Sequence, residues 1–294
     1  MTATFRRYDN RSLFCEDYHK LREFLLRLDD PNYHFGRWDW MITHDWLDAS
    51  GLPAIGLWEE SGDIVAAATY DCALGSAYLL TDSEHHHLYE EMLVHAEKAL
   101  AKDGDFRVLI KEGDENFQNI AATHGFFPTT KKECDAVYPI NLGSISYQLP
   151  EGFSITSMAD TYDLYKYGQV LWKGFNHEAN GEGPFSPDDA KNGSAGFERP
   201  NVDLSLKVAV VAPNGDFVSY CGMWYDTRSR SALVEPVATD PAFRMMGLGK
   251  VAVLEGIRRC GEQGAERAFV GSSQQFYYNI GFRPYTTHTW WKKK

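Results

Sequence analysis

The two halves of the chain repeat one pattern of predicted strands and helices, and this repetition limits the folds that the chain can adopt. Residues 54–70 and 208–224 each contain two apolar runs joined by a turn that centres on Gly-Asp. Two apolar runs around such a turn are typical of a β-hairpin. The turn glycines, Gly62 and Gly215, lie 153 positions apart (215 − 62). This spacing predicts a tandem duplication.

A second pair of landmarks supports the duplication. The run His-Gly-Phe-Phe-Pro-Thr-Thr at 124–130 resembles Ile-Gly-Phe-Arg-Pro-Tyr-Thr-Thr at 280–287. Their glycines, Gly125 and Gly281, lie 156 positions apart (281 − 125), which is nearly the offset of the hairpins. A length of 294 residues also favours two domains.

The same order of elements is predicted in each half: strand, helix, hairpin, strand, helix, strand, helix, strand. This order gives an α+β fold in which a mixed sheet is flanked by helices. Pro150 and Gly152 interrupt the pattern near the middle of the chain. We therefore expect two domains, 1–148 and 149–294.

Composition excludes several classes of partner. With 29 basic and 41 acidic residues the net charge is −12, which disfavours nucleic-acid binding. The N-terminus lacks an apolar signal segment, and no apolar run approaches the ~20 residues that span a bilayer, so we expect no membrane association. The five cysteines are widely spaced and form no Cys-x-x-Cys pair. We therefore expect reduced thiols, a cytoplasmic location and no metal.

The motif with the clearest chemistry is Arg244-x-x-Gly247-x-Gly249, between a predicted strand at 232–239 and a predicted helix at 247–264. Glycine permits a ligand to approach the backbone closely. The first amides of a helix are unsatisfied and carry partial positive charge, so they bind anions such as pyrophosphate. The amides expected to do so are those of Met245, Met246, Gly247, Leu248, Gly249 and Lys250. A simple helix-entry turn is the alternative.

At these residues the chain resembles the GNAT superfamily, the Gcn5-related N-acetyltransferases. Their signature is a strand ending in Val-x-Pro, followed by Arg/Gln-x-x-Gly-x-Gly/Ala at the start of a helix; here Thr239 stands where valine is usual. A second family motif, aromatic-Tyr-x-x-x-Gly-Phe, is matched by residues 276–282. The resemblance covers roughly 153–294, and 1–148 weakly. It implies two GNAT-like domains, each with a mostly antiparallel, twisted sheet.

The resemblance implies transfer of an acetyl group from acetyl-CoA to a primary amine by direct attack in a ternary complex. The loop that contains Arg244 would bind the CoA pyrophosphate, and Val237 and Thr239 would pair with the pantetheine arm. A backbone N–H at Val237 or Ala238 would polarise the thioester carbonyl. Tyr277 matches the tyrosine that protonates the departing thiolate, with its neighbour Tyr278 as the second choice.

A protonated amine cannot attack, so a base or a water relay to one is expected. Glu235 precedes the motif on the strand, where several family members carry a carboxylate. Strand alternation would place Glu235 on one face together with Val237. A surface glutamate or a structural ion pair is the alternative reading. His177 and Glu178 are rival bases; they lie in an irregular stretch, 176–200, that suits either a substrate lid or a disordered loop.

The first half lacks this chemistry. It has no Arg-x-x-Gly-x-Gly, and Ala121 stands four residues before Gly125, where Tyr277 precedes Gly281. We expect a degenerate domain that serves packing or forms one wall of a substrate cleft. Tryptophans would line that wall or simply fill the core (Trp38, Trp40, Trp46 and Trp58). His87, Glu91 and His95 share a helix face, but without a further ligand a solvated helix is the better interpretation.

Two other functions compete with acetyl transfer. Gly247-x-Gly249-x-x-Ala252 satisfies the dinucleotide fingerprint of an oxidoreductase, but the next predicted strand, 265–271, ends without the acidic residue that the fingerprint requires. A non-catalytic CoA-binding or interaction protein is the other alternative. The acceptor, a small-molecule or peptide amine, is left open by the sequence, as are the acyl chain length and the choice between monomer and homodimer.

Overall fold

The computed structural model describes residues 3–188 and 196–294. The chain forms two compact units. Unit 1 comprises Met1–Ala136, Gly271–Ser273 and Pro284–Lys294, and unit 2 comprises Val137–Val270 and Gln274–Arg283. None of the helices within the described residues is long and apolar enough to cross a membrane.

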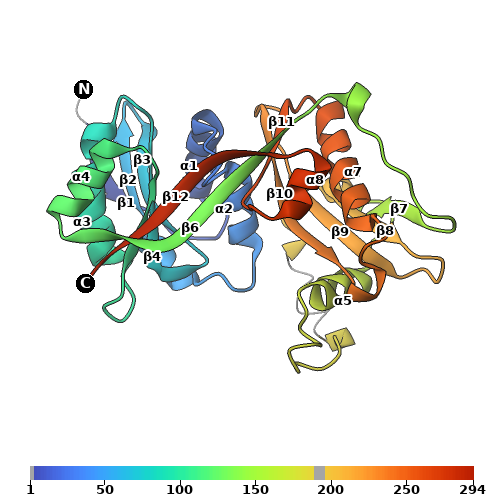
Figure 1. Ribbon diagram of the computed structural model, residues 1–294. Coiled ribbons are helices and arrows are strands. Elements are labelled where there is room, and N and C mark those ends of the chain that lie inside the picture. Colours follow the sequence, from blue (N-terminus) through green and yellow to red (C-terminus); the bar gives the residue numbers. More distant parts are fainter. Residues whose placement is uncertain (1–2, 189–195) are drawn as a thin grey trace. The chain divides into compact units, whose positions relative to one another are not determined.

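Unit 1 is a sheet in the order β1-β2-β3-β4-β5-β12-β6, covered by helices (Figure 1). Its strands are β1 (Thr4–Arg7), β2 (Gly56–Glu60), β3 (Asp63–Asp71), β4 (Ala73–Thr81), β5 (Arg107–Lys111), β6 (Phe126–Pro139) and β12 (Arg283–Lys293). Its helices are α1 (Glu16–Leu28), α2 (Phe35–Thr43), η1 (Ala49–Ala54), η2 (His86–Leu88), α3 (Tyr89–Ala99) and α4 (Glu115–Thr123). One large core includes the fully buried rings of Trp38 and Trp58.

Unit 2 repeats this plan. Its sheet runs β11-β10-β9-β8-β7, with the end of β6 beside β11. The strands are β7 (Ser154–Ser157), β8 (Lys207–Val211), β9 (Phe217–Trp224), β10 (Ser231–Thr239) and β11 (Arg267–Val270). The helices are η3 (Leu142–Ser144), α5 (Leu164–Gly174), η5 (Leu204–Leu206), η6 (Pro241–Phe243), α7 (Leu248–Glu262) and α8 (Gln275–Ile280). Helices α5 and α7 both pack on β9 and β10 (Figure 1).

The predicted fold class is confirmed. In each unit a hairpin leads into a strand, a helix and a strand that returns parallel: β3-β4-α3-β5 in unit 1 and β9-β10-α7-β11 in unit 2. The pairs β1–β2, β2–β3, β5–β12, β7–β8 and β8–β9 are antiparallel. All four landmark glycines have a positive φ: Gly62 (92°), Gly125 (83°), Gly215 (87°) and Gly281 (123°). Glycine suits these turns because it lacks the Cβ that makes positive φ costly.

The predicted division lies at 148/149, whereas the chain passes from unit 1 to unit 2 between Ala136 and Val137, and Gly271–Ser273 and Pro284–Lys294 return to unit 1. Strand β12, at the end of the chain, belongs to unit 1 and pairs antiparallel with β5 from His288↔Lys111 to Lys292↔Arg107. Trp290 on this strand is 2% exposed and donates its indole N–H to Glu133 at 2.9 Å. Because buried apolar surface and strand pairing hold β12 there, a break in the sequence pattern does not mark the whole boundary.

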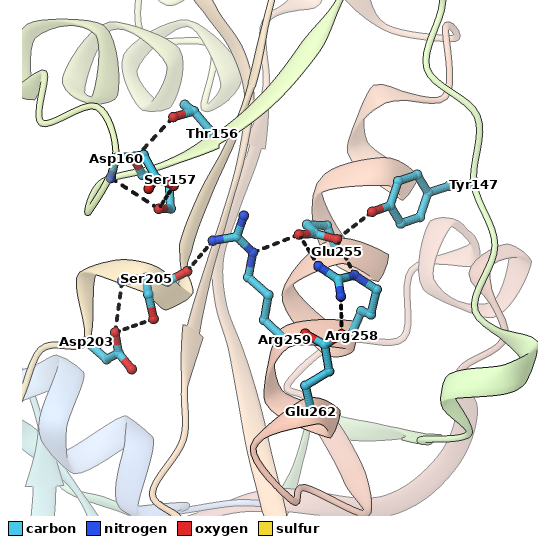
Figure 2. A network of polar contacts seen from close by, with 10 residues as sticks. All are labelled: Tyr147, Thr156, Ser157, Asp160, Asp203, Ser205, Glu255, Arg258, Arg259 and Glu262. Atoms are coloured by element: carbon cyan, nitrogen blue, oxygen red, sulfur yellow. Dashed lines mark hydrogen bonds and ion pairs between the residues drawn. The ribbon is translucent and has the colours of Figure 1, made fainter.

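Helix α7, which follows the glycine motif, is fixed by a buried carboxylate. Figure 2 shows Glu255 accepting hydrogen bonds from Tyr147, Arg258 and Arg259. Arg259 also donates to the carbonyl of Ser205 at 2.7 Å. Because Glu255 is only 3% exposed, it needs these donors to remain ionised. The network therefore ties the segments around η3 and η5 to α7.

Burial alone would raise the pKa of Glu255, but hydrogen bonds from Arg258, Tyr147 and Arg259 outweigh burial and hold the pKa at about 2. The pKa of this carboxyl is lower in the folded protein than in the unfolded chain, where it is about 4.5. Its ionisation therefore stabilises the fold at every pH above about 4.5, and this stabilisation is lost as the pH falls from 4.5 toward 2. A shift of this size corresponds to stability on the order of 2–3 kcal/mol near neutral pH.

We therefore predict that Glu255→Gln lowers the free energy of unfolding by about 2–3 kcal/mol at pH 7, and by about 1 kcal/mol less at pH 3.5. Urea unfolding at both pH values measures the difference. Glu262→Gln is the matched control, because Glu262 pairs with the same Arg258 at the exposed surface and such a pair contributes under about 1 kcal/mol. Equal losses in the two variants would contradict the assignment.

Candidate active site

A β-bulge interrupts β10 at the centre of the candidate site. Val234 pairs with Met223 and Val237 pairs with Cys221, so two residues of β10, Glu235 and Pro236, oppose Gly222 alone. A Cβ at Gly222 would lie 2.5 Å from the carbonyl oxygen of Glu235, which real structures do not allow. The bulge therefore requires glycine at this position. An isolated glycine within a strand is the sequence signal for such a bulge.

The bulge overturns the predicted alternation of side chains. Directly opposed residues on paired strands point to the same face of a sheet. A Cβ at Gly256 of α7 would lie 2.7 Å from Met223 and 3.5 Å from Cys221, so their partners Val234 and Val237 both face α7. Simple alternation places these two valines on opposite faces. The extra residue in the bulge is the physical reason for the difference.

Beyond the bulge, β10 separates from its parallel neighbour. The pairing of β10 with β11 covers only Ser231, Ala232 and Leu233, although β10 continues to Thr239. On its other side β10 remains paired with β9 through Val237, Ala238 and Thr239. The predicted cofactor-binding strand residues therefore lie on a segment with one edge unpaired to β11, as backbone pairing with a ligand requires.

The turn from β10 to α7 has an unusual backbone. Asp240 begins it by accepting a hydrogen bond from the amide of Ala242 at 2.9 Å. Met245 has φ of +64° and is fully exposed, and Gly247, the N-cap of α7, has φ of +81°. A left-handed conformation is uncommon for methionine, and such conformations gather at ligand-binding turns.

The amides at the start of α7 are available to a ligand. No side chain caps the helix, and within the described part of the chain no acceptor is found for the amides of Leu248, Gly249 and Lys250. A Cβ added at Gly247 would meet nothing within 4 Å, so open space adjoins this turn. A Cβ at Gly249 would lie 3.0 Å from Thr239 Oγ1 and 3.2 Å from Phe276. Gly249 is thus needed for packing, and Gly247 for its conformation.

The corresponding turn of unit 1 also begins with an aspartate, because Asp82 follows β4 as Asp240 follows β10. Between β4 and α3, Asp82 accepts hydrogen bonds from the amides of Glu84 and His85 at 3.0 and 3.2 Å. It also lies 2.7 Å from the imidazole Nδ1 of His85. Asp82 and Asp240 therefore begin their turns in the same way, and α3, like α7, has no side-chain cap. The turn of unit 1 differs because it lacks the Arg-x-x-Gly-x-Gly run. Ala121, at the repeat position of Tyr277, is buried in the core of unit 1.

Arg244 holds the turn in place. Its guanidinium donates to the carbonyl of Gly174 at 2.8 Å, to Asn176 Oδ1 at 3.2 Å and to the carbonyl of Thr239 at 3.3 Å. These bonds join the turn to the C-terminal end of α5. A Cβ at Gly174 would lie 2.7 Å from the Cβ of Ala238, so α5 packs closely on β10 at this point. The sequence identified Arg244, but not these backbone partners.

Tyr277 lies on α8 and is 8% exposed. Its ring packs against Phe276 and Phe282, with centroids 5.0 and 5.5 Å away. Burial, with smaller contributions from Cys221 and Glu235, raises the pKa of Tyr277 above its usual range. The phenol is therefore protonated at neutral pH, and its hydroxyl has no hydrogen-bond partner among the described residues. The neighbouring Tyr278 is half-buried.

Glu235 is half-buried in the bulge, close enough to Tyr277 for its charge to raise the pKa of the phenol. The rival bases lie elsewhere in unit 2. His177 stacks on Trp172 with ring centroids 4.2 Å apart, and its Nδ1 lies 2.9 Å from Glu182. Glu178 is exposed. The structure therefore brings Glu235 near Tyr277 and engages His177 within its own segment.

The predicted irregular stretch at 176–200 falls partly outside the described residues, which omit 189–195. The described part before them folds back onto α5. The indole of Trp172 donates to the carbonyl of Gly183 at 2.9 Å. A Cβ at Gly168 would lie 2.2 Å from Phe185, so that ring rests directly on the helix.

The histidine-rich helix of unit 1 makes structural contacts. Glu91 accepts the indole N–H of Trp58 at 2.9 Å, and His95 Nε2 lies 2.9 Å from the carbonyl of Ala54. Across 3–188 and 196–294, no group of three or more His, Cys, Asp and Glu side chains could hold a metal ion. Of the tryptophans proposed for a cleft wall, Trp38 is fully buried, whereas Trp46 is 72% exposed.

Comparison with known proteins agrees with this geometry. A family model described as the acetyltransferase (GNAT) family matches residues 172–282, from the end of α5 to the start of β12. This range contains the bulge, the glycine turn and Tyr277. No curated protein sequence matches the chain significantly.

Solved structures share the fold of nearly the whole chain. A tandem GNAT protein from the clavulanic acid biosynthesis pathway has a TM-score of 0.62 at 15% identity, over 99% of this chain and 98% of that one. A GCN5-related N-acetyltransferase from Sphaerobacter thermophilus has a TM-score of 0.61 at 13% identity, over 99% and 95%. A GNAT-family acetyltransferase from Colwellia psychrerythraea has a TM-score of 0.56 at 11% identity, over 99% and 100%.

At these identities the likeness to solved structures shows the fold alone. The family match supplies the sequence relationship for the second half of the chain. The family match at 172–282 shows that the second half of the chain is similar in sequence to the GNAT family, and the whole chain shares the two-unit fold of solved GNAT proteins.

Proposed function

We propose that the protein is an N-acetyltransferase that transfers an acetyl group from acetyl-CoA to a primary amine at a single site in unit 2. The observation that carries this proposal is the uncapped start of α7, with open space at Gly247, beside the unpaired edge of β10. Free amides at a helix N-terminus suit the pyrophosphate of CoA. The edge of β10 at Val237 and Thr239 suits the amide groups of the pantetheine arm.

Each residue then has a defined task. The amides of residues 245–250 bind the pyrophosphate, and Arg244 holds their turn against α5. A backbone N–H at Val237 or Ala238 donates to the carbonyl oxygen on which negative charge develops. Glu235 accepts the proton that the amine loses, directly or through water, and Tyr277 donates its proton to the departing sulfur. Acetyl-CoA supplies the acyl group as an activated thioester.

The burial of the cysteines in unit 2 favours direct transfer of the acetyl group to the amine over transfer through an acyl-cysteine. In unit 2, Cys221 and Cys260 are fully buried, and burial raises the pKa of Cys221 to about 12. Burial likewise raises the pKa of Cys260. Because the thiolate is the nucleophilic form, neither side chain suits an acyl-cysteine route. The acceptor is a small-molecule or peptide amine.

We predict that acetyl-CoA binds with a stoichiometry of one and that NAD does not bind, as calorimetry will measure. Gly247→Val should weaken acetyl-CoA binding at least about tenfold, because its side chain enters the space beside the free amides. Gly62→Val is the matched control: Gly62 has φ of +92° and nothing within 4 Å, so it carries the same backbone strain in a hairpin of unit 1. Equal affinity in both variants would refute the pyrophosphate site, and a stoichiometry of two would show that unit 1 also binds.

We predict that Tyr277→Phe lowers kcat about 10²-fold, since general acid catalysis contributes about 10²–10⁴-fold, and changes the Kd for acetyl-CoA less than about twofold. Thiol release with a panel of amines measures the rate. Tyr278→Phe is the control, because it removes the adjacent phenol from the same short helix. An unchanged kcat in Tyr277→Phe would remove this residue from the mechanism. Binding without transfer to any amine would favour a non-catalytic CoA-binding protein.

A further inference from the structure

The bulge that carries Glu235 depends on a hydrogen bond from a side chain. The indole N–H of Trp224, on β9, donates to the carbonyl oxygen of Glu235 at 3.0 Å. Trp224 is 6% exposed, so this bond is shielded from water. In a regular antiparallel ladder, a backbone amide would serve such a carbonyl. Here the extra residue breaks the ladder, and the next residue, Pro236, has no N–H to offer.

A buried lysine holds this indole in turn. Lys207 on β8 is 3% exposed, and its ammonium lies 3.5 Å from the centre of the Trp224 ring. The same ammonium donates to the carbonyl of Met223 at 2.7 Å. Burying an ammonium is costly, and the contact between a cation and an aromatic face is strongest away from water. Lys207 therefore restricts the indole from one side, while Glu235 fixes its N–H.

The chain of contacts ends at the proposed base. Lys207 lies opposite Gly222, the residue that faces the bulge, so lysine, glycine and bulge are neighbours across three strands. The direction of the Glu235 side chain is set by the backbone of the bulge, because no alternation applies there. A change that frees the Glu235 carbonyl would let the bulge relax, and the carboxylate would move with it.

Resting on the proposed function of Glu235 as base, we propose that Trp224 and Lys207 are positioning residues for acetyl transfer. They neither contact the acceptor nor move a proton. They hold the Glu235 carbonyl, and through it they hold the carboxylate at the place where it accepts the proton of the amine. The free amides at the start of α7 have no part in this contact, so acetyl-CoA affinity is independent of it.

A double-mutant cycle tests the proposal. Trp224→Phe keeps an aromatic ring for Lys207 and removes the N–H donor. We expect kcat to fall about tenfold with the Kd for acetyl-CoA changed less than about twofold, and the loss to be largest below neutral pH. In a Glu235→Gln background, Trp224→Phe should cause no further loss, because the carboxylate that it positions is already absent. Lys207→Met should lower kcat in the same direction.

Trp38→Phe is the control, since Trp38 is a fully buried tryptophan of unit 1 that donates its indole N–H to the carbonyl of Tyr18 at 3.3 Å. It should keep the wild-type kcat. Two results would overturn the proposal: a wild-type kcat in folded Trp224→Phe, or an equal loss in the Glu235→Gln background, which would mean that Trp224 acts through packing.

Hydrogen exchange separates this inference from the proposed function. In Trp224→Phe, amide exchange should accelerate at residues 234–239 and stay unchanged at β11. Unchanged exchange along 234–239 would overturn the role of the indole whether or not the wild type is active. If the wild type acetylates no amine, the proposed function fails and the catalytic role of Trp224 and Lys207 fails with it, whereas accelerated exchange would still show that the indole fixes the bulge.

Discussion

The close approach of two backbones at Gly222 is the constraint on which the site depends. Without a Cβ at this residue, β10 fits one extra residue opposite β9. The bulge turns Val234 and Val237 to the same face, and the pairing of β10 with β11 ends just before it, at Leu233. Beyond Leu233, that edge of β10 has no partner strand within 3–188 and 196–294. A regular, fully paired sheet would leave no backbone groups for a ligand.

Polar contacts at the start and in the middle of α7 complement the unpaired edge of β10. At its start, the amides of Leu248, Gly249 and Lys250 find no acceptor among the residues that the structure describes, and Arg244 rather than a side-chain cap holds the turn. In the middle of the helix, Glu255 accepts hydrogen bonds from two arginines and a tyrosine, and these bonds fix the helix against neighbouring segments. The helix can thus present free donors without fraying. The corresponding turn of unit 1, between β4 and α3, lacks the Arg-x-x-Gly-x-Gly run.

How much the sequence reveals depends on whether a feature is local. The hairpin turns and the glycine turn were predictable, because positive φ at Gly62, Gly215 and Gly247 is a property of single residues. The face of the sheet to which the Val237 side chain points was not predictable, because the bulge arises from contact between β9 and β10. The hydrogen-bond partners of Arg244 and the contact of Lys207 with Trp224 could not be predicted either, since these contacts join residues that are distant in the sequence.

The position of β12 has a consequence for synthesis on the ribosome. Unit 1 begins at the N-terminus, yet a strand in the interior of its sheet, between β5 and β6, consists of residues near the C-terminus. A nascent chain that has completed β6 therefore exposes the edges of β5 and β6 until residues 283–293 have been synthesised. Exposed edges of this kind invite pairing with other chains. The sheet of unit 1 can thus be completed only after the strands of unit 2 have been synthesised.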